Sequence, residues 1–189
     1  MRTAKVTRKT KETEIKVELN LDGRGEYEIH TGIKFFDHLL SSFSRHGRID
    51  LQINAKGDNE HHIVEDVAIS LGEAIKKSLG EKVGIARFGH AIIPMDDVLM
   101  LTSIDLGGRS YCSLDLKMRK KRVEDLSVEM VPHFLETLAS EARLNLHVKL
   151  LDGKNDHHKA ECLFKALGIA LRGACSVVGR GIPSTKGKI

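Results

Sequence analysis

Two histidine-rich segments of the chain share one spacing of metal-ligating side chains. The sequence HHIVE covers residues 61–65, and HHKAE covers residues 157–161. In an α-helix, positions i and i+4 share a face, whereas neighbouring residues diverge by about 100°. The first histidine and the glutamate of each segment can therefore bind one ion together, while the second histidine must serve a different ion.

A further histidine precedes each segment at nearly the same distance. His38 lies 23 residues before His61, and His133 lies 24 residues before His157. We expect two sites, each combining a His-Glu pair from one repeat with a lone histidine from the other and a spare upstream histidine. The eight candidate ligands are His38, His61, His62, Glu65, His133, His157, His158 and Glu161.

Three imidazoles and one carboxylate per ion suit a first-row divalent metal such as Mn, Fe, Co or Zn. Four protein ligands on an octahedral ion leave two positions open, which is typical of catalytic rather than structural sites. A single HHxxE segment would more often hold ordinary surface or core histidines. Two copies with upstream histidines in register favour metal binding instead.

The two segments belong to a longer internal repeat that covers residues 37–79 and 132–175. Each copy has a helical apolar pattern, an alternating strand (49–55 and 144–150), a glycine-containing turn and a second apolar helix. Asn59 and Asp156 are the expected N-caps of the helices that carry the ligands. Upstream, the alternating segment 15–21 and the apolar segment 98–106 both run into glycine turns, which predicts further antiparallel strands.

Each half is therefore expected to form two or three antiparallel strands, a helix, a strand and a helix. Alternating strands need cover on one face, and helices packed on that face provide it. We predict an α+β fold with halves at 1–86 and 87–189, which pack through their helices as one compact unit.

The composition excludes several classes of protein. The net charge of +4 and an aromatic content of 4% argue against a nucleic-acid partner. No apolar run is long enough for a membrane helix, and the polar N-terminus does not look like a secretory signal. Three cysteines without ligand spacing argue against disulfides and Cys-bound zinc. We expect a cytoplasmic protein without a membrane partner, in which the basic run at 117–122 is a solvated loop.

Several short motifs, taken together and in order, resemble the imidazoleglycerol-phosphate dehydratase family across nearly the whole chain. They are TKET at 10–13, DGRG at 22–25, DHLL at 37–40 with HG at 46–47, the two HHxxE segments, RFG at 87–89, PMDD at 94–97, GGR at 107–109 and PSTKG at 183–187. Two departures, Asn59-Glu60 before the first HH pair and Glu141-Ala142 opposite His46-Gly47, leave every candidate ligand in place.

The resemblance implies a duplicated β-β-β-α-β-α fold of the ribosomal protein S5 domain 2-like type, with helices sandwiched between two four-stranded sheets. It also implies a homo-oligomer of 24 subunits, with two Mn²⁺ ions per active site and sites at subunit contacts. The implied reaction is a hydro-lyase step of histidine biosynthesis, in which imidazole glycerol phosphate loses water to give imidazole acetol phosphate.

The resemblance also assigns individual roles. Glu12 matches the acid/base glutamate and His46 a substrate-contacting histidine, although without the resemblance Glu12 would be an exposed strand carboxylate. The implied phosphate ligands are Arg87, Arg109, Lys165, Ser184, Thr185 and Lys186. Lys165 follows the candidate ligand Glu161 by four residues and so shares its helix face. Asp96 and Asp97 match the PMD segment but receive no firm role.

The implied mechanism starts from a proton on C2 that is not acidic, because no carbonyl neighbours it. If both ring nitrogens bind metal, the substrate's imidazole can become an imidazolate and expel the C3 hydroxyl. The diazafulvene-like intermediate then loses the C2 proton to give an enol and finally the ketone.

Two other functions are compatible with parts of the pattern. A di-metal phosphate-ester hydrolase would also use open His/Glu sites, but it usually has bridging carboxylates, which are few here. A metal-dependent structural oligomer or metal store would have closed ligand shells and no anion pocket, and the candidate arginines and lysines argue against it.

Overall fold

The computed structural model describes all of residues 1–189, and its two halves have the same order of elements. The first half contains β1 (Thr3–Lys9), β2 (Thr13–Asn20), β3 (Tyr27–His30), α1 (Lys34–Gly47), β4 (Asp50–Gly57) and α2 (Glu60–Leu79). The second contains β5 (Phe88–Met95), β6 (Val98–Asp105), β7 (Tyr111–Asp115), β8 (Arg122–Val123), β9 (Leu126–Ser127), α3 (Met130–Ala142), β10 (Asn145–Asp152) and α4 (Asp156–Cys175). The short β8–β9 hairpin has no counterpart in the first half.

The two main sheets have equivalent strand orders, β1-β2-β4-β3 and β5-β6-β10-β7. Most neighbours are antiparallel, as expected, but β3 runs parallel to β4 and β7 parallel to β10. Each sheet therefore contains both parallel and antiparallel pairs. The two parallel pairs arise because a helix connects β3 to β4 and another connects β7 to β10, and helical crossover connections join parallel strands.

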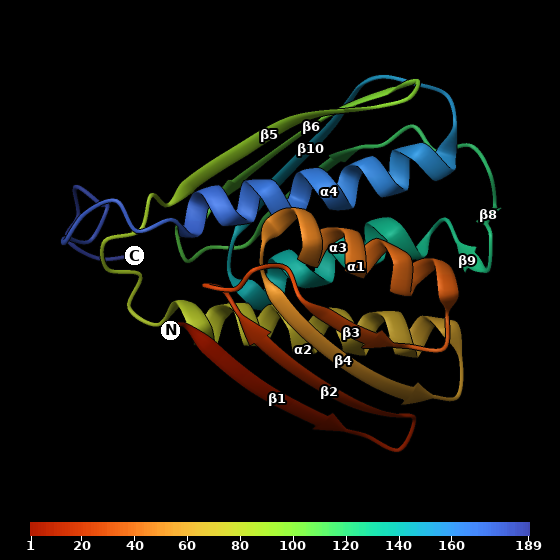
Figure 1. Cartoon of the computed structure of the whole chain (residues 1–189), viewed down its shortest axis with the longest axis horizontal. Coiled ribbons are helices and arrows are strands. Elements are labelled where there is room, and N and C mark those ends of the chain that lie inside the picture. Colours follow the sequence, from red (N-terminus) through yellow and green to blue (C-terminus); the bar gives the residue numbers. More distant parts are fainter.

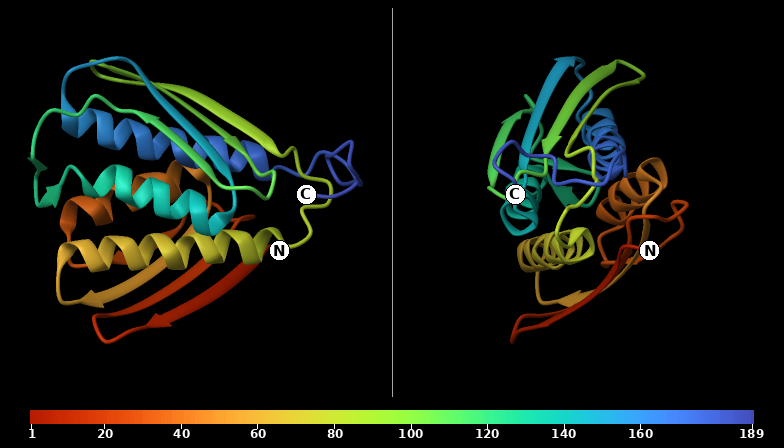
Figure 2. Two further views of the ribbon diagram at one scale, coloured as in Figure 1. Left: turned by 180° about the vertical axis from the view of Figure 1, so that it is seen from behind. Right: turned by 90° about the vertical axis from the view of Figure 1, so that its left-hand side faces the viewer.

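All four helices lie between the two sheets (Figure 1), and the views in Figure 2 show the same layers from behind and from one end. Alternation along β2 buries Ile15, Val17 and Leu19 against these helices. Phe134 of α3 stacks on Phe164 of α4 and meets the edge of Phe36 of α1. The predicted α+β sandwich is confirmed, and no helix is both long and apolar enough to cross a membrane.

Glycines allow the helices of the two halves to approach closely. A Cβ on Gly168 of α4 would lie 2.3 Å from the carbonyl oxygen of Phe43 in α1. A Cβ on Gly72 of α2 would lie 2.6 Å from the Cβ of Glu141 in α3. Gly72 and Gly168 both lie 11 residues after the first histidine of their HHxxE segment, so the duplication preserved both close contacts. These contacts set α1 beside α4 and α2 beside α3.

Of the two predicted helix N-caps, the structure confirms one and contradicts the other. The Asn59 side chain accepts a hydrogen bond from the backbone N–H of His62 and caps α2 as predicted. The prediction for Asp156 is wrong, because Asn155 caps α4 by accepting from the N–H of His157. The Asp156 carboxylate is instead buried and accepts from the N–H groups of Arg119 and Lys120.

Asp156 also forms a buried ion pair at the start of α4. Its Oδ1 lies 2.8 Å from Nζ of Lys159, and both side chains are 2% exposed. Lys159 also donates to the carbonyl of Lys117 at 2.8 Å. Burial alone would raise the pKa of Asp156, but the hydrogen bonds from Lys159 and from two backbone N–H groups hold it below the ordinary value. The pair fixes the 117–120 loop to the helix that carries His157.

Asp156→Asn should lower the free energy of unfolding of the metal-free protein by about 3 kcal/mol, because it leaves the Lys159 ammonium buried without its counter-ion. Urea unfolding measures this change. The double variant Asp156→Asn/Lys159→Met should recover much of the loss, and a double variant as unstable as the single one would contradict the explanation. In the wild type, the contribution of the pair is present above the unfolded aspartate pKa of about 4 and is lost as the pH falls through the lower folded pKa.

Candidate metal centre

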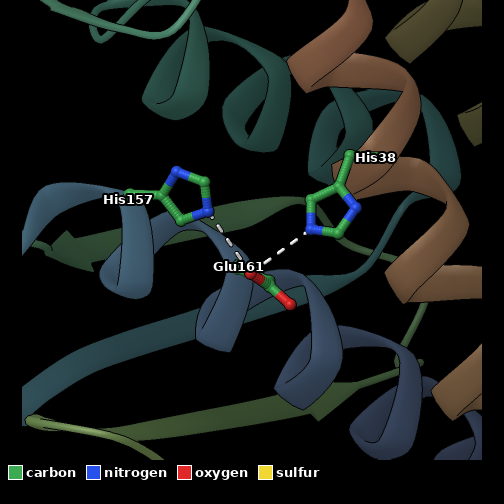
Figure 3. Close-up of side chains that lie close together, drawn as sticks. All are labelled: His38, His157 and Glu161. Atoms are coloured by element: carbon green, nitrogen blue, oxygen red, sulfur yellow. Dashed lines mark ion pairs between the residues drawn. The ribbon is translucent and has the colours of Figure 1, made fainter.

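The first candidate site combines His38 of α1 with His157 and Glu161 of α4 (Figure 3). Glu161 Oε2 lies 3.3 Å from Nε2 of His38 and 3.5 Å from Nε2 of His157. His157 also packs against the Phe35 ring, with 4.7 Å between the ring centroids. Burial alone would raise the pKa of Glu161, but hydrogen bonds from Lys165 and His38 lower it. The carboxylate is therefore ionised and faces two imidazole nitrogens.

The second candidate site joins His61 and Glu65 of α2 to His133 of α3. The His61 and His133 rings stack with 4.6 Å between their centroids, and Nε2 of His133 lies 3.8 Å from Oε1 of Glu65. In each triad, the His-Glu pair comes from one repeat, and the third residue is the upstream histidine of the other repeat. This exchange follows from the packing of α1 on α4 and of α2 on α3.

Both triads fit a divalent metal ion. In each, the three ligand atoms lie within 4.8 Å of one another. Nε2 of His133 is buried and has no hydrogen-bond partner, which is costly for a polar atom unless something else binds it. Imidazole nitrogens with one carboxylate oxygen are the donors that first-row divalent ions prefer. A metal ion would give the His133 nitrogen the partner that it lacks.

The second histidines of the HH pairs lie outside both triads, as the 100° divergence between helical neighbours predicts. Nδ1 of His62 is 2.8 Å from Oδ1 of Asp58, and Nδ1 of His158 is 2.7 Å from Oδ1 of Asp97. The hydrogen bond to Asp58 raises the pKa of His62. Both imidazoles are therefore oriented by a carboxylate, but neither completes a triad of its own chain.

Glu12 lies beside one of these histidines, in the turn between β1 and β2. Its Oε2 is 3.8 Å from Nδ1 of His62. The Thr10 hydroxyl accepts hydrogen bonds from the N–H groups of Glu12 and Thr13 and so shapes the turn. The Thr13 hydroxyl donates to the buried carboxylate of Asp66, the residue after Glu65. Glu12 is thus in an ordered turn fixed to α2, and not within a strand.

Two other predicted residues lie next to the first triad. Nζ of Lys165 is 2.9 Å from Oε1 of Glu161, on the helix face that the spacing predicts. His46 follows His38 by two helical turns, and desolvation, together with the Lys165 charge, lowers its pKa. Lys165 therefore contacts the first triad directly, and His46 lies close enough to Glu161 and Lys165 for their charges to act on it.

The remaining predicted phosphate ligands lie near the C-terminal end of α4 and the C-terminal tail. Figure 1 shows both chain termini at this end of the molecule. The guanidinium of Arg87 pairs with Asp105 at 2.7 Å and donates to the carbonyl of Pro183 at 3.0 Å. The backbone N–H of Arg87 donates to the carbonyl of Ala174. Ala174 lies about 20 Å along α4 from Glu161. Arg109 is exposed in the β6–β7 loop, and the tail residues Ser184, Thr185 and Lys186 form a turn beyond Pro183. One chain does not bring them to its own triads.

Three acidic residues near the triads carry no predicted site role. Asp58 and Asp97 hold His62 and His158, and Glu124 faces His157. The PMDD motif included Asp97 but did not indicate that its carboxylate binds His158. No spacing rule could have placed Glu124 beside His157, because the contact depends on how the β8–β9 hairpin folds.

The fold and the site define a duplicated α+β protein with two His/Glu triads that could bind metal ions. A model of the family described as imidazoleglycerol-phosphate dehydratase matches residues 31–171. The chain belongs to the imidazoleglycerol-phosphate dehydratase family, hydro-lyases of histidine biosynthesis.

Full-length relatives support this assignment. The chain is 52% identical to the imidazoleglycerol-phosphate dehydratase of Chloroherpeton thalassium, with 100% of this chain and 98% of the relative covered. It is 53% identical to that of Methanococcoides burtonii, with 99% of each covered. The structure of the Pyrococcus furiosus enzyme in complex with (S)-C348 matches with a TM-score of 0.86 and 39% identity, over 97% of this chain and 100% of that one.

Proposed function

We propose that this enzyme removes water from imidazole glycerol phosphate to give imidazole acetol phosphate, with two Mn²⁺ ions per active site. The observation that carries the proposal is the pair of open triads, each with two imidazoles and one carboxylate, together with the Glu12 carboxylate beside the candidate ligand His62. When bound, the ions supply Lewis acidity to the nitrogens of the substrate's imidazole ring. Another first-row divalent ion would fit the same donors.

The chain's own residues then have separable tasks. The eight histidine and glutamate ligands would hold the two ions, which would bind the substrate's imidazole ring. Loss of the ring N–H proton would be favoured there, and that proton and the C3 hydroxyl would leave together as water. The C2 proton of the resulting diazafulvene-like intermediate would then be acidic, and its return to the ring side of that intermediate would give the enol and finally the ketone. Glu12 moves protons at the glycerol chain, since its carboxylate is 58% exposed and borders the candidate ligand His62. His46 of α1 and Lys165 of α4 contact the substrate beside the first triad.

We further propose that each active site is built by more than one copy of the chain. His62 and His158 lie outside the triads of their own chain, and Arg87 and Arg109 lie far from them. In imidazole glycerol phosphate only three carbons separate the imidazole ring from the phosphate oxygen, so the substrate cannot span that distance within one chain. A homo-oligomer, 24 copies as the resemblance implies, would let one copy bind the phosphate while others bind the ring. Ser184, Thr185 and Lys186 would close the phosphate pocket.

The boundary of the two halves is also part of this proposal. Residues 1–86 and 87–189 are proposed to be repeat halves that fold as one unit, because the helices of each half pack on those of the other. Neither half holds a complete triad, since His38 and His133 serve the other half's His-Glu pair.

The test is an assay with imidazole glycerol phosphate and added Mn²⁺, repeated after chelation. Metal-dependent formation of imidazole acetol phosphate is expected. The absence of dehydration would overturn the proposal. Turnover of generic phosphate esters would favour the hydrolase, and metal binding without any turnover would favour a structural oligomer or metal store.

A further inference from the structure

Glu124 is the tip residue of the β8–β9 hairpin and has an unusual backbone. Its φ is +51°, in the left-handed region that side chains other than glycine rarely adopt. Strained residues of this kind persist only where the surrounding structure holds them, and they are enriched at functional sites. The hairpin has no counterpart in the first half of the chain, so this residue breaks the internal symmetry.

The surrounding contacts hold the hairpin in place. The Asp125 carboxylate accepts from the N–H groups of Lys34 and Phe35, which fixes the hairpin to the N-terminus of α1. Arg122 pairs with Glu60 at 3.0 Å, which fixes it to α2. Because both neighbours are anchored, Glu124 is held over the first triad and lines the same pocket as His38, His157 and Glu161.

The carboxylate of Glu124 faces the side of His157 that is turned away from the ligand cluster. Oε1 lies 3.5 Å from Nδ1, whereas Nε2 of the same ring faces Glu161. A carboxylate at one ring nitrogen fixes the tautomer that leaves the other nitrogen free to bind a metal. Nδ1 of His62 and of His158 is likewise paired with a carboxylate, at the shorter distances of 2.8 Å from Asp58 and 2.7 Å from Asp97. Of the four HH imidazoles, only His61 has no carboxylate paired at Nδ1.

We propose that Glu124 is a positioning residue for His157, and that it makes the His38–His157–Glu161 triad the tighter of two unequal metal sites. This inference rests on the proposed metal function of the triads. Glu124 pairs with Nδ1 of His157, leaves Nε2 to the ion and opposes rotation of the imidazole. The other triad lacks this support at His61 and therefore holds its ion more weakly.

The test is a calorimetric titration of chelator-treated protein with Mn²⁺ alone. The wild type should show two classes of site of different affinity. Glu124→Gln should weaken the tighter class by about 10- to 100-fold and leave the other unchanged. In a His133→Ala background, which removes a ligand of the other triad, the surviving class should show the same loss.

Further variants distinguish the positioning of His157 from effects of the substitution on folding and on the overall charge near the site. Glu124→Gly relieves the left-handed strain, so it should keep or raise the melting temperature of the metal-free protein while losing the same affinity. Lys117→Gly removes another left-handed residue in the preceding loop, and Glu129→Gln removes a nearby exposed carboxylate. Both should leave both affinities unchanged.

If Glu124→Gln binds Mn²⁺ with wild-type affinity at both classes of site, the inference is wrong. It is also wrong if the substitution weakens Mn²⁺ binding equally at both classes, because that result indicates a general effect of charge. If the wild type binds no Mn²⁺ at all, the proposed metal function itself fails.

Discussion

Glu12→Gln should lower kcat by about 10²- to 10⁴-fold while Mn²⁺ and substrate still bind. The glutamine side chain keeps the size and hydrogen-bonding shape of the glutamate but cannot take up or release a proton. Glu12 belongs to neither triad, and its turn is held by Thr10 and Thr13 through groups that the substitution leaves intact. The loss should therefore appear in kcat, with KM and metal content nearly unchanged.

A matched control is available two residues along the chain. Glu14 of β2 pairs with Lys9 of β1 and with Lys16 of β2, and it belongs to neither triad. Glu14→Gln should keep wild-type turnover. Steady-state kinetics and metal analysis of both variants complete the comparison, and a fully active Glu12→Gln enzyme would remove Glu12 from the mechanism.

Helical spacing predicted which side chains of each HHxxE segment lie together. In the structure His61 lies with Glu65 and His157 with Glu161, and the second histidine of each pair lies outside both triads. It did not determine which further imidazole joins each pair. That choice depends on which helices pack together, and the close approach at Gly72 and Gly168 is a tertiary feature that only the structure shows.

Predictions from local sequence also failed where another part of the chain binds the side chain in question. Asp156 has the residue type of an N-cap, but the backbone of the 119–120 loop and the Lys159 ammonium engage its carboxylate, so the preceding Asn155 caps the helix. The parallel pairing of β3 and β7 likewise depends on the helical crossovers. The alternation of apolar residues is the same in both strand directions.

The candidate phosphate residues show a different limit of sequence-based prediction. The family motifs place Arg87 and Lys165 in one pocket, whereas in a single chain Lys165 lies in the middle of α4 beside Glu161 and Arg87 lies at the C-terminal end of that helix. A motif records which residues serve a site, but not which copy of the chain supplies them. The separation within one chain is what makes the proposal of shared sites testable.

Removal of the metal ions should abolish turnover and also reduce the size of the particle. Each triad offers three ligands, and the fourth imidazole, His62 or His158, points away from the triads of its own chain. An ion bound by a triad and by an imidazole of a neighbouring copy ties the two copies together. Its binding free energy therefore adds to the stability of that contact, and chelation withdraws it.

Light scattering before and after chelation measures the change, and added Mn²⁺ should restore the original size. His62→Ala and His158→Ala should give smaller particles even with Mn²⁺ present, because each removes the ligand that would cross between copies. His90→Ala is the matched control, since His90 is an exposed histidine of β5 outside both triads. A full-sized particle after complete removal of metal would contradict ligands shared between copies, and the separated phosphate residues would then need another explanation.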